Sequence, residues 1–341
     1  MSIATACQNG LCGNSSKMNV EMVDFDAVYE QDEYLNGGTY GKVYKCRKRI
    51  KGEDEKEYAV KIQEVCFDGG EESSYEKTLD EANIWSSLNH VNIVKLYQCF
   101  LQRNQFYFVM ELIQGGNLFE EILKKSQYTE KDACLYMKQV LNALSYLHNH
   151  GIFHRDVKPD NIMLCDNAQY GSGSLVKLTD FGLARRLTNG QRRIVCTPSG
   201  APLYLAPETI MQVALGFPVD VWACGVILYI LLYGAPPFWS QDTNQLFLDI
   251  VGTEVDYSYN ENEIRVSFLG KDLIQEMLVK DQTRRITASD ALEHPWIVQG
   301  DKLSREHRRS TLEHLSLFKN SVYDVKKPRL KNRQGEFNEC D

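Results

Sequence analysis

The stretch that decides the fold reads His154-Arg155-Asp156-Val157-Lys158-Pro159-Asp160-Asn161, and it is followed by Asp180-Phe181-Gly182 and Ala206-Pro207-Glu208. Transfer of a phosphoryl group requires a base, cations and oxygen ligands for magnesium rather than covalent chemistry. Asp156 can accept the proton of an attacking hydroxyl, and Lys158 can steady the charge of the migrating group. Asn161 and Asp180 offer the oxygen ligands that Mg²⁺ prefers. These motifs together predict a phosphotransferase site.

An isolated Asp-Phe-Gly is usually a turn after a strand, but chance does not explain the three motifs in this order. On these residues, positions 25–297 resemble a eukaryotic protein kinase domain of the serine/threonine type. The resemblance implies an α+β, two-lobed protein kinase fold. Its small lobe, residues 25–112, would be a mostly antiparallel β-sheet with one helix, and its large lobe, residues 113–297, mostly α-helical. It also implies ATP and Mg²⁺ as cofactors, and proteins with Ser or Thr as substrates.

An ion pair between Lys61 and Glu81 is expected in the small lobe. Tyr58-Ala59-Val60-Lys61 reads as an alternating strand, and the resemblance makes Lys61 the lysine that contacts the α- and β-phosphates. Glu81 occupies the family's position for its partner on the single helix. Taken alone, Lys61 would be an ordinary surface lysine and Glu81 a solvated helix charge.

The loop that would cover the phosphates departs from the family pattern at one position, because Asn36 replaces its first glycine. Glycine allows positive φ and close approach to phosphates, and asparagine tolerates left-handed geometry well, so at most weakened nucleotide binding is expected. The nucleotide-binding residues predicted for this loop are Leu35, Asn36, Gly37, Gly38, Thr39, Tyr40, Gly41, Lys42 and Val43.

By the same resemblance, further residues contact the nucleotide. Met110 is the gatekeeper, and the backbone of Glu111 and Ile113 would hydrogen-bond the adenine. The remaining predicted nucleotide contacts are Ala59 and Met163, which with Val43 would enclose the ring, and Asn117. Ordinary apolar core is the alternative for the aliphatic members of this set.

Periodicity predicts the main elements around these motifs. Alternating apolar residues over Phe106–Met110 indicate a strand, and helices are predicted over Leu118–Lys125, Thr129–His150 and Pro218–Tyr233. Residues 169–174 are expected to form a solvent-exposed turn between two strands.

The substrate-facing segment contains a second departure. Lys158 in its motif resembles serine/threonine rather than tyrosine kinases, and so does the segment from Gly200 to Glu208. Ala201, however, stands where the family usually has a threonine whose hydroxyl bridges Asp156 and Lys158. Loss of one such hydrogen bond costs on the order of 1 kcal/mol, a several-fold effect on the rate.

The subgroup resembled is that of the calcium/calmodulin-dependent kinases, including the kinase-like domain of calcium/calmodulin-dependent serine kinase scaffolds. Such scaffold domains lack the metal-binding Asp and Asn and act by binding partners, whereas this chain has both Asp180 and Asn161. An active kinase is therefore the first hypothesis. A catalytically weak or inactive scaffold is the alternative, and Asn36 and Ala201 keep it open.

Composition excludes several classes of protein. With 341 residues, of which 43% are hydrophobic and 25% charged, the chain can bury a large core. Its most apolar stretch, Val219–Ala235, contains Asp220 and is short of the roughly 20 apolar residues of a membrane span. Met1-Ser2-Ile3 matches neither a secretory signal nor a myristoylation motif. The cytoplasm is the expected compartment, nucleic acid is not an expected partner, and the ten scattered cysteines predict reduced, mostly buried thiols.

Both ends of the chain differ from the middle. Residues 1–24 are predicted to be a disordered tail, and residues 298–341 form a basic tail. Positions 304–320 resemble the autoinhibitory helix of calcium/calmodulin-dependent kinases, with Arg308 three residues before a candidate phosphosite, Thr311. Its apolar stripe either docks on the large lobe or merely caps the fold. Calmodulin is a candidate partner, but Pro328 interrupts the basic helix that calmodulin would need. The basic cluster is either a nuclear signal or a solvated tail.

Thr197 is the second candidate phosphosite. It lies in the segment between the Asp-Phe-Gly and Ala-Pro-Glu motifs, where the resemblance implies a regulatory phosphate that Arg155 could bind. An unmodified loop threonine is the alternative. Arg285 is expected to pair with Glu208 and to brace the substrate loop.

Overall fold

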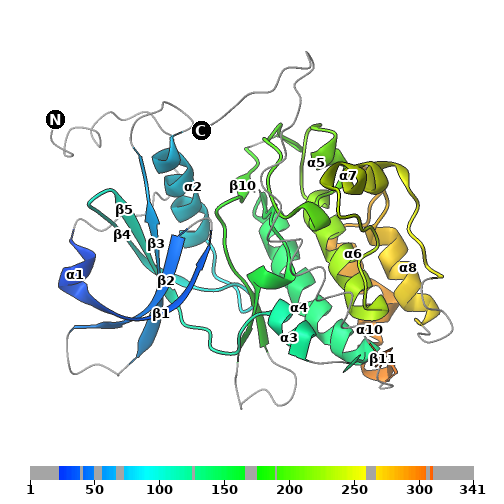
Figure 1. The fold of residues 1–341 in the computed structure, drawn as a ribbon, viewed down its shortest axis with the longest axis horizontal. Coiled ribbons are helices and arrows are strands. Elements are labelled where there is room, and N and C mark those ends of the chain that lie inside the picture. Colours follow the sequence, from blue (N-terminus) through cyan, green and yellow to red (C-terminus); the bar gives the residue numbers. More distant parts are fainter. Residues whose placement is uncertain are drawn as a thin grey trace. The chain divides into compact units, whose positions relative to one another are not determined.

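The computed structural model describes residues 23–38, 41–49, 56–66, 73–124, 127–165, 175–188, 190–258, 266–304 and 308–309. They divide into two compact units (Figure 1). Of the described residues, those up to Leu88 together with Leu96–Glu111 form the first unit, and Asn89–Lys95 together with those from Leu112 onward form the second. Most of the predicted tail 1–24 and the turn 169–174 lie outside the described residues.

The first unit is an antiparallel five-stranded sheet with strand order β1-β2-β3-β5-β4. The strands are β1 (Tyr29–Gly38), β2 (Gly41–Lys48), β3 (Glu57–Glu64), β4 (Leu96–Gln102) and β5 (Gln105–Glu111). Helix α1 (Phe25–Val28) precedes the sheet, and α2 (Ser74–Ser86) follows β3. The Ser73 side chain caps α2 by accepting a hydrogen bond from the Glu76 amide, which supplies one of the helix's four unpaired N–H groups with a partner.

Strand β3 is where predicted, but it does not alternate between buried and exposed positions. Tyr58, Ala59, Val60 and Lys61 are all buried, because both faces of this central strand are covered. Val60 packs in a cluster with Phe25 of α1 and residues of all five strands, whereas the side chain of Lys61 meets α2. Continuous burial is the pattern of a strand with two covered faces.

The second unit is mostly helical. Its α-helices are α3 (Leu118–Lys124), α4 (Glu130–Asn149), α5 (Pro207–Ile210), α6 (Pro218–Tyr233), α7 (Thr243–Gly252), α8 (Phe268–Met277), α9 (Ala288–Glu293) and α10 (Pro295–Val298). The 3₁₀ helices among its described residues are η3 (Pro159–Asn161), η5 (Pro202–Tyr204) and η6 (Gly300–Lys302). The three predicted helices are confirmed to within a residue at each end, and Thr129 caps α4 in a reciprocal capping box with Asp132.

Three two-stranded ladders complete the second unit. They pair β7 (Ile152–Phe153) with β10 (Arg185–Arg186), β8 (Ile162–Cys165) with β9 (Leu175–Leu178), and β6 (Gln127–Tyr128) with β11 (Arg308–Arg309). Arg308 and Arg309 thus form a strand, not part of a helix, because their backbone pairs across to β6. Thr311 and the rest of the expected autoinhibitory segment lie outside the described residues.

Helix α6 is confirmed as a buried helix. Every residue from Val219 to Tyr233 is buried, since the helix packs against both α4 and α8 (Figure 1). It begins with Pro218, whose fixed φ suits a first helical position, and ends at Gly234 with φ 73°. Among the described residues, no helix combines the length and apolarity needed to span a membrane. Four of the seven described cysteines are buried, and all seven are free thiols.

Candidate active site

The side chain of Asp156 is held by two neighbours in the loop between β7 and β8. Its Oδ2 accepts hydrogen bonds from Lys158 Nζ at 2.8 Å and from Asn161 Nδ2 at 2.9 Å. Asn161 Nδ2 also donates to the Asp156 carbonyl at 2.8 Å. The turn η3 makes this possible, because it folds the chain back within five residues. The sequence-predicted base, cation and amide are therefore brought together around one carboxylate.

The charge of Lys158 is favoured by this arrangement. Burial alone would lower the pKa of its ammonium group, but the charge of Asp156 and the hydrogen bond to it raise that pKa above the ordinary 10.5. Asp160 and Asp180 add to the same effect. A cation is thus held beside Asp156 throughout the physiological pH range, where it can stabilise negative charge on a transferred group.

Asp220 of α6 fixes the backbone that carries Asp156. Its Oδ1 accepts the Arg155 amide at 2.8 Å and its Oδ2 the His154 amide at 2.8 Å, and His148 Nε2 lies 2.9 Å from Oδ2. Burial alone would raise the pKa of Asp220, but the His148 ring and the neighbouring His154 hold it below its ordinary value. Arg155 has φ 70°, a left-handed conformation that is costly for a residue with a side chain. The Asp220 carboxylate therefore holds this loop in a strained conformation.

Asp180 also adopts a left-handed conformation, with φ 65°. The residue after it, Phe181, is buried against the His154 ring at 5.0 Å between centroids. His154 Nε2 lies 3.1 Å from the Thr179 carbonyl, so contacts with His154 tie the Asp180 turn to the loop of Asp156. The half-buried Asp180 is consequently presented from the same unit as Asn161.

The donor set of Asn161 and Asp180 fits magnesium. Because Nδ2 of Asn161 donates to Asp156, its Oδ1 is the atom suited to a metal, and Asp180 adds a carboxylate. Mg²⁺ is commonly held by one or two such protein oxygens, with phosphates and water completing its shell. Among the described residues, no group of three or more His, Cys, Asp and Glu side chains forms an alternative metal site. When bound here, the ion would neutralise phosphate charge.

The expected ion pair of the first unit is present. Lys61 Nζ lies 2.9 Å from Glu81 Oε1, and both side chains are less than a tenth exposed. Lys61 comes from β3 and Glu81 from the buried side of α2. Burial of two opposite charges is tolerated only when they are paired, so each residue fixes the position of the other.

The glycine-rich loop spans the turn from β1 to β2, of which Thr39 and Tyr40 lie outside the described residues. Gly41 requires glycine, because its φ is 136° and an added Cβ would lie 2.5 Å from the Ile62 carbonyl oxygen. The prediction that Asn36 is tolerated because it adopts left-handed geometry is wrong: its φ is not positive, and as part of β1 it pairs with Val43 of β2. Instead, its Oδ1 accepts the Gly37 amide at 2.8 Å.

The other predicted nucleotide contacts are divided between the two units. In the first unit, Leu35 is exposed, and the buried Ala59 pairs across the sheet with the buried Met110, which precedes Glu111. The remaining strand pairs in this set are Gly38 with Gly41, Lys42 with Ile62, and Val43 with Lys61. In the second unit, the half-buried Ile113 follows β5, and Met163 forms an isolated antiparallel β-bridge with Asn117. Asn117 Oδ1 accepts the Glu120 amide at 2.9 Å, so its side chain caps α3. This gives Asn117 a structural role that the sequence analysis missed.

The segment after the Asp180 turn is braced at two points. Arg155 Nη2 donates to the carbonyl of the exposed Thr197 at 2.7 Å. Further on, Arg285 donates to both carboxylate oxygens of Glu208, at 2.6 and 3.0 Å, as expected. Both members of that pair are buried, and Arg285 Nη1 also donates to the Pro218 carbonyl at 2.8 Å.

Comparison with known proteins agrees with this geometry. The sequence pattern of the family described as "Protein kinase domain" matches residues 29–297. The chain belongs to the protein kinase family. A similar kinase is the calcium/calmodulin-dependent protein kinase type II alpha chain of Drosophila melanogaster, which is 38% identical over 295 residues. The match covers 86% of this kinase but 54% of the relative, so the chain spans about half of that protein's length.

The two-lobed fold of the family agrees with the sheet of the first unit and the helices of the second, and ATP and Mg²⁺ are the cofactors that this family generally uses. The residue that the sequence analysis missed in this kinase is Asp220. A single acidic residue inside the apolar run Val219–Ala235 was the available signal, because a charge retained in such a run needs strong partners.

Proposed function

We propose that the chain is an ATP- and Mg²⁺-dependent serine/threonine protein kinase in which Asp156 is the catalytic base. The observation that carries the proposal is the position of the Asp156 carboxylate, which is held by Lys158 at 2.8 Å and Asn161 at 2.9 Å. A base fixed in this way can accept the proton of a Ser or Thr hydroxyl as its oxygen attacks the γ-phosphorus. Lys158 then stabilises the charge of the transferred group.

The other roles follow the family pattern. Lys61, oriented by Glu81, would bind the α- and β-phosphates, and Asn161 and Asp180 would bind Mg²⁺. The loop from Leu35 to Val43 would cover the phosphates. The adenine would contact Ala59, Met110, Glu111, Ile113 and Met163. Asn117 is the remaining proposed nucleotide contact. The kinase domain would extend over residues 25–297, with its small lobe ending at 112.

Phosphate transfer from radiolabelled ATP with Mg²⁺ to a mixed Ser/Thr peptide library tests the proposal. We expect incorporation by the full chain and none by Asp156→Asn or Asp180→Ala. Asp301→Asn is the matched control, because the side chain of Asp301 is fully exposed. Equal incorporation by Asp156→Asn and the control would refute the assignment of the base.

A kinase-like scaffold with weak or no catalysis is the second candidate, and Asn36 is the observation in its favour. Backbone amides of a glycine-rich loop bind phosphates, but the Gly37 amide already donates to Asn36 Oδ1. Asn36→Gly would release this amide. If the chain is such a scaffold, calorimetry should detect no nucleotide binding by the unaltered chain, and Asn36→Gly should gain binding.

Regulation is proposed at three places. Phosphorylation of Thr197 would put a phosphate near Arg155, which already contacts its carbonyl, and Thr311 is the second proposed phosphosite. The similar fly kinase is described as calcium/calmodulin-dependent, so calmodulin binding by the tail is a further proposal. Adding Ca²⁺ and calmodulin to the transfer assay, with Thr197→Ala and Thr311→Ala in parallel, tests all three. A cytoplasmic location, with the nucleus as the alternative, stays a prediction for imaging of the tagged chain.

A further inference from the structure

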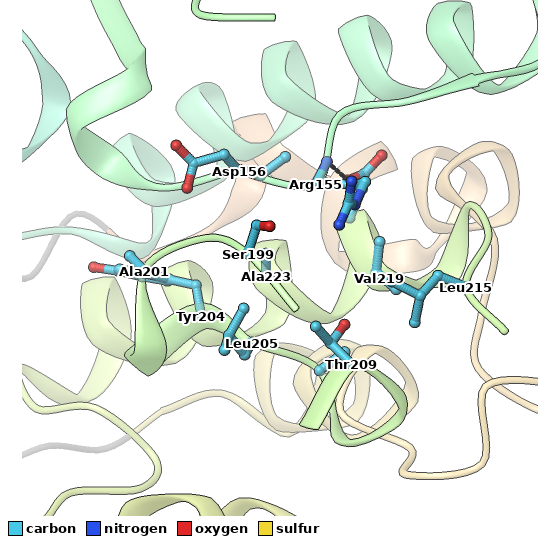
Figure 2. A pocket seen from close by; sticks show the side chains of 13 residues that line it. Arg155, Asp156, Ser199, Ala201, Tyr204, Leu205, Thr209, Leu215, Val219 and Ala223 are labelled. Atoms are coloured by element: carbon cyan, nitrogen blue, oxygen red, sulfur yellow. Dashed lines mark hydrogen bonds between the residues drawn. The ribbon is translucent and has the colours of Figure 1, made fainter. Parts of the chain in front are cut away.

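A small cavity is lined in part by residues between Ser199 and Ala206. Asp156, Ser199, Ala201 and Thr209 contribute to its lining, and its volume is about 20 Å³. Figure 2 shows Ser199, Ala201 and Thr209 as parts of this lining. A water molecule requires about 10–15 Å³ of such space. The cavity therefore has room for an ordered water molecule.

The hydroxyl of Thr209 makes the cavity polar. Thr209 is only 5% exposed, and within the described part of the chain its side chain has no hydrogen-bond partner. Native proteins usually satisfy a hydroxyl that has so little access to bulk solvent with an ordered water. Ser199 lines the same cavity, and its hydroxyl donates to the Thr197 carbonyl at 3.1 Å, which leaves its oxygen able to accept.

We propose that this cavity is a binding site for one ordered water molecule, held by the hydroxyls of Thr209 and Ser199. The water would tie α5 to the segment Ser199–Ala201. That segment lies directly against the loop of Asp156: a Cβ on Gly200 would be 3.1 Å from the Arg155 carbonyl and 3.6 Å from Asp156 Oδ1. Thr209 is thereby a positioning residue, since it acts on Asp156 through the water and this segment.

A crystal structure of the unaltered chain at high resolution tests the site directly. We expect one water within hydrogen-bond distance of Thr209 Oγ1 and Ser199 Oγ. The same water should be present in Thr209→Ser, which keeps the hydroxyl, and absent from Thr209→Val, which replaces it with a methyl group of similar size. A dry cavity in the unaltered chain would overturn the proposal, as would a water that persists unchanged in Thr209→Val.

Kinetics test the positioning role, and this arm rests on the proposed kinase function. We expect Thr209→Val to lower kcat about fivefold, the equivalent of one lost hydrogen bond. The KM for ATP should stay unchanged, because the residues described as lining the cavity all belong to the second unit, whereas Lys61 belongs to the first. Thr209→Ser should retain the original rate. Equal kcat for all three proteins would refute the role of Thr209, while the crystallographic result stands even if the chain transfers no phosphate.

Discussion

Replacement of Asp220 by asparagine tests how the catalytic loop is held. The carboxylate is 1% exposed and accepts two backbone amides at 2.8 Å, while His148 lies at 2.9 Å. Asparagine has nearly the same shape, but one of its two positions becomes an NH₂ group that faces a donor. At least one hydrogen bond to a charged group is lost, and each is worth about 1.5–3 kcal/mol. We expect the free energy of unfolding to fall by about 3 kcal/mol.

The same replacement should impair catalysis more than a substitution elsewhere that lowers the free energy of unfolding by the same amount. With one acceptor oxygen in place of two, the left-handed conformation of Arg155, φ 70°, is held less firmly. Asp156 follows directly in the chain and moves with it. We expect kcat to fall at least about tenfold, since misplacement of a catalytic group by about an ångström has effects of this size or larger.

The assay is urea unfolding followed by fluorescence at several pH values, together with phosphate transfer at neutral pH. The pKa of Asp220 is lowered on folding, so its stabilisation is complete above the ordinary value of 3.8 and is lost as the pH falls below it. The difference between the unaltered chain and Asp220→Asn should therefore be largest near neutral pH and shrink in acid. Asp301→Asn should change stability by less than about 0.5 kcal/mol. A similarly small effect of Asp220→Asn would refute the reasoning.

Three further substitutions have definite expected outcomes. Lys61→Met should abolish phosphate transfer and, by leaving Glu81 buried without its partner, lower the free energy of unfolding by about 3 kcal/mol, as urea titration would show. Arg285→Lys should lower the free energy of unfolding by about 2 kcal/mol, because a single ammonium cannot make both bonds to Glu208. A decrease below about 0.5 kcal/mol in the same urea titration would contradict the bidentate geometry. Arg103→Gly should raise the free energy of unfolding by about 0.5–1 kcal/mol, and with it the melting temperature, because φ is 49° at this hairpin residue. A lower melting temperature would contradict this expectation.

The parts of the site that could be predicted from the sequence are those fixed by short spacing. Asp156, Lys158 and Asn161 are separated by a few residues, so one turn brings them together wherever the loop lies. The pair of Lys61 and Glu81 was predicted across a longer distance, but only because the motifs resemble a known family. Helix α6 was evident from the length and apolarity of its own residues.

The features that could not be predicted depend on backbone groups or on distant segments. Asp220 binds amides of residues 154 and 155, and no side-chain pattern reveals which backbone N–H groups lack a partner. Burial of the two faces of β3 depends on separate segments: Phe25 of α1 packs with Val60, and α2 meets Lys61. The φ of Asn36 depends on the pairing of β1 with β2, which the loop sequence alone does not fix.

The complete burial of α6 also has a consequence for synthesis of the chain. The helix is covered by α4, which precedes it, and by α8, which begins only at Phe268. While residues 234–267 leave the ribosome, a helix in which eleven of sixteen residues are Val, Leu, Ile, Trp or Tyr lacks its contact with α8. Nascent chains at this stage expose an aggregation-prone surface of the kind that chaperones bind. Chains that end between α6 and α8 should therefore be recovered in association with a chaperone or in the insoluble fraction, whereas chains that extend past Met277 should begin to escape both.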